Sequence, residues 1–174
     1  WASPAIDAVG IDCYWPLSDW REGREHLDYA AGVRSIYDLA YLRSNVQGGE
    51  GYAWYYASPE DRAGQVRTPI TDGAGKPWVF RYKALKSWWS SPHHNRPGGV
   101  ESTTSTTWVS QSKPVWFTEL GCPAIDKGAN QPNVFVDPKS SESFLPYYSH
   151  GNRDDLAQRR YLQVFVEAFD PVHA

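Results

Sequence analysis

Two short apolar segments, each followed by a long polar loop, do most to limit what this chain can fold into. The first covers residues 6–14, and the second is Pro114–Glu119, whose terminal glutamate precedes Gly121. Both are rich in β-branched or aromatic residues, which is typical of buried strands. Helical patterns lie between and after them, so the order of elements predicts an α/β fold made of parallel βαβ units. In such units the loops that follow the strands meet at the carboxyl edge, where sites are built.

Helical segments are expected on either side of the second strand. One runs from about Gly32 to Val46, and another covers Trp78–Trp89. Between them, Ser58 offers an N-cap and Pro59 suits the first position of a further helix. The last helix is expected to begin near Asn152, where acidic residues would favour its N-terminal dipole.

Charge and hydropathy exclude two classes of protein. The 174 residues carry 17 Lys and Arg against 20 Asp and Glu, for a net charge of −3, with no block of like charge. Nucleic-acid binding needs a basic stripe, and none is present. No apolar run approaches the roughly 18–20 residues of a membrane-spanning helix. We therefore expect no nucleic-acid partner and no membrane span.

Cofactor and metal signals are also missing from the sequence. Cys13 and Cys122 are the only cysteines, and their spacing predicts neither a zinc knuckle nor a disulfide framework. The segment Gly48–Gly51 lacks the GK[ST] ending of a phosphate-binding loop. No cofactor and no metal are predicted. The chain begins at Trp1 without an initiator Met, so we expect residues 1–174 to be a single partial domain cut from a longer chain.

The aromatic content of the chain is unusual, with nine Trp and eleven Tyr but no Met. These rings could build a heavily aromatic core, which composition alone favours, or they could form stacking platforms for sugar rings. Several of them fall in loops that could line the carboxyl face as substrate-binding residues. They are Trp15, Trp20, Trp54, Tyr55, Tyr147 and Tyr148.

Glu119 is the leading candidate for chemistry. It ends a strand that must be mostly buried, and a carboxylate in that place is held rigidly and points at the open face of the fold. Cleavage of a glycoside needs two carboxylates, one of which can act as a nucleophile. The alternative is a glutamate that pairs with a nearby arginine to close the strand end, and spacing alone leaves both interpretations open.

Asp12 and Tyr14 stand at the end of the first strand. The phenol of Tyr14 could donate a hydrogen bond to Glu119 and orient it, while Asp12 could bind a sugar hydroxyl. Alternatively, Asp12 only caps the loop and Tyr14 only packs. If the strands are parallel neighbours, Tyr14 and Glu119 should lie on the same face, close enough to form a hydrogen bond.

A pair of histidines, His93 and His94, lies in the loop before the second strand. Adjacent histidines point in different directions and make a poor metal pair without distant ligands. Solvated loop histidines are the commoner explanation. We keep both as candidate substrate contacts and predict no metal site.

With these residues laid out, the sequence resembles a known family, the TIM-barrel-like domain of the large tail (baseplate hub) protein of gene transfer agents and related tailed phages. The resemblance runs along nearly the whole chain. It is carried by residues 1–7, 10–20, 48–51, 54–58, 67–73, 113–123, 126–128 and 137–143.

That domain is in turn similar to retaining glycoside hydrolases of the (β/α)8 clan. The resemblance implies that the chain is the C-terminal portion of such a barrel, with the strand ending in Tyr14 as strand six and the strand ending in Glu119 as strand seven. It implies that Glu119 corresponds to the clan's nucleophile and Tyr14 to the tyrosine that orients it. The clan's acid/base glutamate follows strand four, and no residue of this chain maps onto it.

Two functions from different classes follow from the resemblance. The first is a tail or baseplate component that engages host cell-surface polysaccharide, with other tail proteins and the rest of its own barrel as partners. It would sit in the tail of a phage-like particle assembled in the bacterial cytoplasm. The second is an active retaining glycoside hydrolase that degrades envelope polysaccharide. A second carboxylate about 5–5.5 Å from Glu119 would favour the hydrolase.

Overall fold

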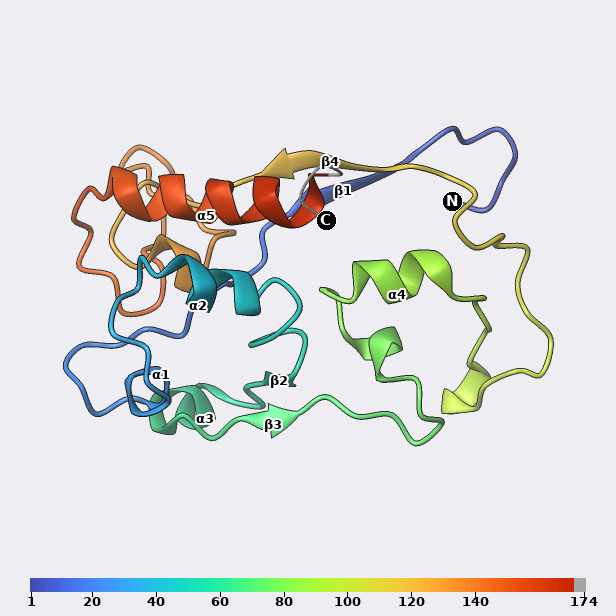
Figure 1. The fold of residues 1–174 in the computed structure, drawn as a ribbon, viewed down its shortest axis with the longest axis horizontal. Coiled ribbons are helices and arrows are strands. Elements are labelled where there is room, and N and C mark those ends of the chain that lie inside the picture. The colour runs from blue at the N-terminus through green and yellow to red at the C-terminus, as the bar shows by residue number, and fades with distance from the viewer. Residues whose placement is uncertain (171–174) are drawn as a thin grey trace.

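Two parallel strands run side by side along the upper edge of the computed structural model, which describes residues 1–170 (Figure 1). Strand β1 spans Val9–Cys13 and strand β4 spans Val115–Leu120. Their register pairs Val9 with Val115 and Asp12 with Glu119, and it shifts at a bulge between Ile11 and Asp12. The predicted parallel pairing of the two apolar segments is therefore confirmed.

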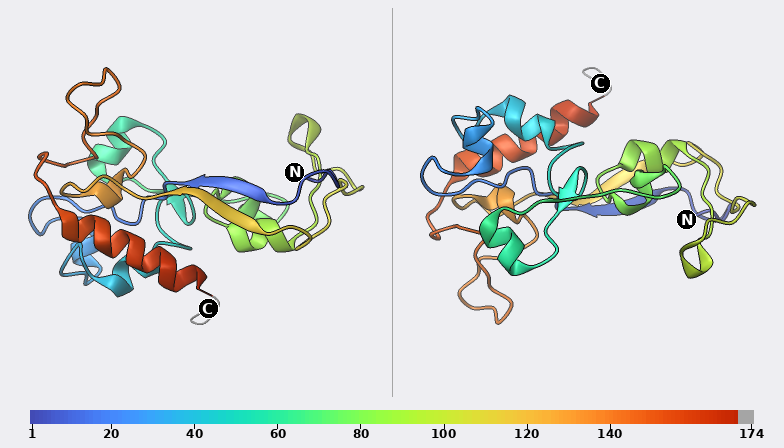
Figure 2. Two further views of the ribbon diagram at one scale, coloured as in Figure 1. Left: turned by 90° about the horizontal axis from the view of Figure 1, so that it is seen from above. Right: turned by 90° about the horizontal axis from the view of Figure 1, so that it is seen from below.

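Helix α5, Asp155–Phe169, covers one face of this strand pair, as Figures 1 and 2 show from two directions. The ring of Phe117 on β4 lies 5.0 Å from that of Phe169 and 6.2 Å from that of Phe165. The helix begins after Asp154, whose side chain accepts a 2.9 Å hydrogen bond from the Ala157 amide. It therefore starts slightly later than the sequence predicts, at an acidic N-cap rather than at Asn152.

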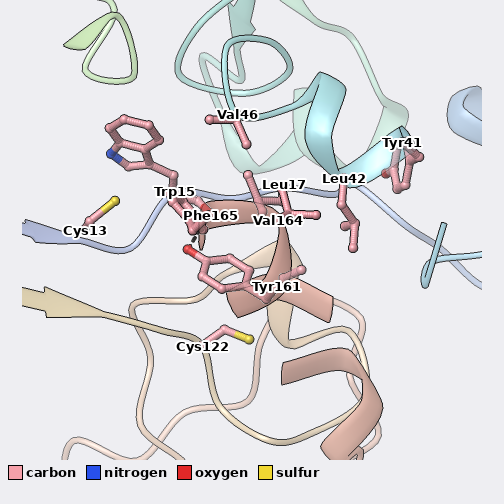
Figure 3. Close-up of a cluster of buried hydrophobic side chains, with 11 residues drawn as sticks. Cys13, Trp15, Leu17, Tyr41, Leu42, Val46, Cys122, Tyr161, Val164 and Phe165 are labelled. Carbon is pink, nitrogen blue, oxygen red and sulfur yellow. Dashed lines mark hydrogen bonds between the residues drawn. The ribbon is translucent and has the colours of Figure 1, made fainter. Parts of the chain in front are cut away.

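The core lies where α5 meets the loop that follows β1 and helix α2, Leu39–Ser44 (Figure 3). Tyr161 and Phe165 of α5 are almost fully buried, and the Tyr161 hydroxyl donates a 2.9 Å hydrogen bond to the carbonyl oxygen of Trp15. The bond satisfies the one polar group that this tyrosine carries into the core. The cluster comprises Cys13, Trp15, Leu17, Tyr41, Leu42, Val46, Cys122, Ala129, Tyr161, Val164 and Phe165.

The remaining elements are short. The helices are α1 (Leu27–Ala30), α3 (Pro59–Gly64) and α4 (Leu85–Ser90), and the 3-10 turns are η1 (Pro77–Phe80), η2 (Pro97–Gly99) and η3 (Gly128–Asn130). Strands β2 (Trp54–Tyr55) and β3 (Thr68–Pro69) form a small antiparallel pair. Helix α3 begins as predicted, because Ser58 Oγ accepts a 3.1 Å hydrogen bond from the Asp61 amide.

The helix expected over residues 32–46 is shorter than predicted. Gly32 has a φ of +101°, which is outside the helical region, and regular structure begins only at Leu39. Asp38 sets this start, because its side chain accepts hydrogen bonds from the amides of Ala40 and Tyr41 at 2.8 and 3.1 Å. A strong N-cap placed inside the apolar pattern thus divides it into a turn and a helix of six residues.

The prediction of one helix over Trp78–Trp89 is also wrong, because the helical backbone is interrupted between η1 and α4. Arg81 has an extended backbone, and Lys83 between the two elements is fully buried. Lys83 Nζ donates to the carbonyl oxygens of Asn45 and Gly48 at 2.9 and 3.1 Å, and also to that of Pro16. These long-range bonds replace the local helical ones at this point.

Candidate functional site

The ends of β1 and β4 bring Tyr14 and Glu119 together. The Tyr14 hydroxyl donates a 2.6 Å hydrogen bond to Glu119 Oε2, as the parallel pairing predicts. This bond, with smaller contributions from burial and from the charges of Glu119 and Asp12, raises the pKa of Tyr14. The phenol therefore stays protonated and acts as a donor that fixes one oxygen of an exposed carboxylate.

A second side-chain bond crosses the same two strands in the opposite direction. Thr118 Oγ1 donates to Asp12 Oδ1 at 2.6 Å, beside the bulge that separates Ile11 from Asp12. Each carboxylate is thus held by one hydroxyl from the neighbouring strand. Within residues 1–170, no hydrogen bond or ion pair engages the second oxygen of Asp12 or of Glu119.

The arginine that could have closed the strand end against Glu119 is not found in the described part of the chain. Glu119 faces solvent with Tyr14 as its hydrogen-bond partner. A carboxylate in this state can accept hydrogen bonds from hydroxyl groups or attract a cation. In a suitable complex it can also act as a nucleophile.

Tyr14 lies on the border of two cavities. The first, which we call the polar cavity, has a volume of about 560 Å³ and includes Asp12, Glu50, Arg62 and Tyr147 in its wall. The second has a volume of about 590 Å³ and is mostly apolar, with Leu120, Cys122, Pro132 and Phe135 among its lining residues. Tyr14 therefore stands beside space of the size that small-molecule sites occupy, whereas Glu119 is not among the residues that line either cavity.

Glu50, Arg62 and Tyr82 are among the residues of the polar cavity that were not expected from the sequence. Arg62 donates to Glu50 through both terminal nitrogens, one bond measuring 2.9 Å, and its guanidinium lies 4.0 Å from the centre of the Tyr147 ring. The two glycines that flank Glu50, Gly49 and Gly51, have positive φ. These glycines were the sequence signal that could have identified Glu50, since a turn with positive φ on both sides fixes the position of the residue between them.

The aromatic residues predicted to contact substrate have different surroundings in the structure. Tyr147 lines the polar cavity and is 37% exposed, so it can offer a ring face to a ligand. Trp15 borders the same cavity but is only 4% exposed, and its ring packs against Phe165 at 5.7 Å between centroids. Trp20 packs on His26. These two tryptophans belong to the packed interior, which favours the core interpretation of the aromatic content.

Trp54 lies on β2 and is covered from one side by the guanidinium of Arg67, 4.1 Å from the ring centroid. It borders a small cavity of about 100 Å³ together with Asp19 and Asp28. Arg67 binds both of these carboxylates, at 2.8 and 2.9 Å. Trp54 thus lies in the polar network around Arg67 rather than beside Glu119, although its small cavity shares Pro16 and Glu50 with the polar cavity.

The histidines lie toward the other end of the strands. His93 stacks on Trp108, with 5.2 Å between ring centroids, and His94 Nδ1 is 2.8 Å from the carbonyl oxygen of Ser102. Their loop follows α4, and Trp89 Nε1 of α4 donates a 2.7 Å hydrogen bond to the carbonyl oxygen of Lys113, two residues before β4. The structure therefore places His93 and His94 near the amino ends of the strands, away from Glu119.

The described residues contain neither a metal-binding cluster nor a membrane-spanning helix. Among residues 1–170, no group of three or more His, Cys, Asp or Glu side chains is arranged to hold a metal ion. None of the helices in that range has the length and apolar character needed to cross a membrane. Cys13 and Cys122 are free, buried thiols, and burial raises the pKa of each to about 12.

Comparison with known proteins agrees with this geometry. A parallel strand pair covered by a helix, with polar side chains at the carboxyl ends of the strands, is a feature that β/α barrels share with other parallel α/β folds. The search of curated proteins found no match. The family model described as the GTA TIM-barrel-like domain, where GTA stands for gene transfer agent, matches residues 1–174. The chain therefore belongs to the GTA TIM-barrel-like domain family.

Proposed function

We propose that this domain is part of a tail or baseplate component of a gene transfer agent or phage-like particle, and that it engages saccharide on the host cell surface. In this proposal β1 and β4 correspond to strands six and seven of a glycoside-hydrolase-like barrel. The observation that carries it is the 2.6 Å hydrogen bond between Tyr14 and Glu119 at the carboxyl ends of adjacent parallel strands.

The polar cavity beside Tyr14 suits a saccharide. Sugars present hydroxyl groups, which carboxylates accept from and phenols donate to, together with flat apolar ring faces. Asp12 and Tyr14 supply the polar groups, and the half-exposed ring of Tyr147 supplies a stacking surface. The cavity volume of about 560 Å³ accommodates one or two sugar rings.

Glycan-array binding of the intact protein that carries residues 1–174 tests this proposal. We expect binding to a surface polysaccharide, and we expect Tyr147→Ala to weaken it because the substitution removes the stacking surface. Tyr55→Ala is the matched control, because Tyr55 is similarly exposed but lines a different cavity. Absence of binding to any saccharide, or equal losses from the two substitutions, would contradict the proposal.

A second candidate function is retaining glycoside hydrolysis with Glu119 as the nucleophile. The observation in its favour is that Tyr14 holds Glu119 Oε2 and leaves Oε1 without a partner in the described chain, as a nucleophilic carboxylate requires. The reaction also needs a second carboxylate about 5–5.5 Å away that donates a proton to the leaving group. Release of new reducing ends from an envelope polysaccharide by the wild-type protein would establish this function.

A further inference from the structure

The second cavity beside Tyr14, which we call the apolar cavity, takes no part in the proposed saccharide contact. It has a volume of about 590 Å³, and its wall is formed mainly by apolar side chains from the end of β4 and the loop that follows. Two of these side chains are open to solvent, since Phe135 is 68% exposed and Val136 is 38% exposed. Exposed apolar side chains gathered around a hollow are typical of a ligand site. The apolar cavity therefore suits an apolar group of a ligand.

The apolar cavity and the polar cavity adjoin each other. Tyr14, Pro132 and Asn133 line both of them. Pro132 is buried, whereas Tyr14 is half-buried and Asn133 is exposed. The boundary between the cavities thus includes two polar side chains that a ligand can reach. A ligand with a polar part and an apolar part could contact both cavities at once.

Asn133 gives this boundary a specific chemistry. Within residues 1–170, its side-chain amide makes no hydrogen bond, so it can donate to a carbonyl oxygen of a ligand. Arg153 also lines the apolar cavity, but it donates two 2.9 Å bonds to Asp155, which offsets its charge. The boundary therefore favours a neutral carbonyl linkage, an ester or an amide, over the free carboxylate of a fatty acid.

We propose that the two cavities together bind an acylated saccharide. The sugar lies in the polar cavity, the acyl chain lies in the apolar cavity, and the ester or amide that joins them lies beside Asn133. This inference rests on the proposed function, because it names the substrate class of the same site. A volume of about 590 Å³ is far larger than an acetyl group needs. The acyl group is therefore a chain, as at the sugar end of a glycolipid.

Calorimetry on the intact protein with a series of N-acylglucosamines tests the proposal. The acetyl, butanoyl, hexanoyl and octanoyl compounds share one sugar and differ by two methylenes at each step. Each step should raise the affinity about fivefold, which is below the limit of about fourfold per methylene that full burial sets. The heat-capacity change of binding should become more negative along the series, because more apolar surface is buried. N-octanoylethanolamine, which has the same chain and linkage without the sugar, should bind more weakly than the octanoyl sugar.

Two exposed phenylalanines of one loop locate the effect. Phe135→Ala removes an apolar side chain from the wall of the apolar cavity and should reduce the gain per step to about twofold or less. Phe144→Ala is the matched control, because Phe144 is 66% exposed but does not line the cavity. It should keep the full gain. Both rings are exposed, so the melting temperatures of the two variants should stay close to that of the wild type.

Three outcomes would overturn the inference. Affinity that is independent of chain length, or a series in which no member binds, would contradict it, while the proposed function would still depend on the glycan array alone. Equal affinity for N-octanoylethanolamine and the octanoyl sugar would show that the cavity takes any acyl chain. Equal effects of Phe135→Ala and Phe144→Ala would place the chain outside the apolar cavity.

Discussion

The Tyr14 hydroxyl and Glu119 Oε2 lie 2.6 Å apart, joined by a hydrogen bond that crosses from the end of β1 to the end of β4. The bond exists because the parallel register places the two strand ends side by side. It is the side-chain contact that orients Glu119 in the described part of the chain. A carboxylate that is otherwise exposed thus acquires a fixed direction from one neighbouring phenol.

Removal of the Tyr14 hydroxyl should weaken saccharide binding while leaving the stability of the fold nearly unchanged. Tyr14→Phe should change the free energy of unfolding by less than about 1 kcal/mol, because the lost bond lies at the surface. Saccharide affinity should fall several-fold, because Glu119 is no longer oriented. Calorimetry and denaturant unfolding measure the two effects. Tyr37→Phe is the control, since it deletes a comparable 2.7 Å bond to Asp154 that lies outside the site, and unchanged affinity in Tyr14→Phe would contradict the assigned role.

The sequence is sufficient to predict the strand pair and to place Tyr14 and Glu119 at its carboxyl edge, although the strands themselves end at Cys13 and Leu120. Both strands are short, apolar and bounded by turns, so their position depends on local pattern alone. Parallel strands end at the same edge, and this single rule brings Tyr14 to Glu119. The same alternation separates Tyr14 from Trp15: consecutive residues point to opposite sides, so Trp15 enters the core while Tyr14 faces Glu119.

The remaining features depend on contacts between distant segments, which no local pattern contains. Lys83 interrupts the apolar pattern of residues 78–89 because carbonyl oxygens of Asn45 and Gly48 accept its ammonium hydrogens. Arg62 reaches the polar cavity through Glu50, twelve residues away in the sequence. His93 was a candidate by residue type, yet its ring stacks on Trp108 near the amino ends of the strands, away from Glu119.

The tight turn beside the polar cavity should not tolerate a side chain at Gly51. Its φ is +79°, and a β-carbon built there would lie 2.1 Å from the ring of Tyr82. Gly51→Ala should therefore destabilise the protein by about 2 kcal/mol or more, through backbone strain and steric overlap. Denaturant unfolding measures the change.

Two further variants separate the causes of that loss. Gly73→Ala should be nearly neutral, because nothing lies within 4 Å of a β-carbon at that position. In the Gly51→Ala background, Tyr82→Ala should recover the steric part of the loss and leave the backbone part. A Gly51→Ala protein as stable as wild type would show that the turn rearranges freely.

Burial of Lys83 should make stability depend on pH. Burial lowers the pKa of Lys83 to about 7, with the charges of Glu50 and Cys13 acting in the opposite direction, whereas an unfolded lysine titrates near pH 10.4. Above about pH 7 the unfolded chain therefore binds more protons than the folded one, and the free energy of unfolding should rise with pH. The expected slope is about 1 kcal/mol per pH unit between about pH 7 and 9.

Denaturant titrations across that pH range test the origin of the slope. Lys83→Met should remove it, while also lowering stability because the carbonyl oxygens of Asn45 and Gly48 lose their donor. Lys86→Met changes an exposed lysine on α4, three residues along the same segment, and should keep the slope. The same slope in Lys83→Met as in the wild-type protein would assign it to other groups.

Glu119→Gln in the intact protein separates the two candidate functions. The substitution keeps the shape of the side chain and an oxygen that accepts the Tyr14 hydroxyl, so the melting temperature should change little. It removes the charge and the nucleophilicity. In a retaining glycosidase, release of reducing ends from an envelope polysaccharide would fall by several orders of magnitude, because the covalent intermediate can no longer form. Affinity for a neutral saccharide would change little, since stacking and hydroxyl contacts remain.

A binding component should behave differently in the same assay. Neither wild type nor Glu119→Gln should release reducing ends, and particles that carry either protein should deliver DNA to a similar extent. We expect this outcome, because hydrolysis also needs a carboxylate that donates a proton. Among the described residues of the polar cavity, Asp12 accepts a bond from Thr118 and Glu50 is paired with Arg62. A tail component must also remain attached after contact, which cleavage of its receptor would oppose. Wild-type protein that releases reducing sugars, beside a silent Glu119→Gln variant, would reverse this preference and establish Glu119 as the nucleophile.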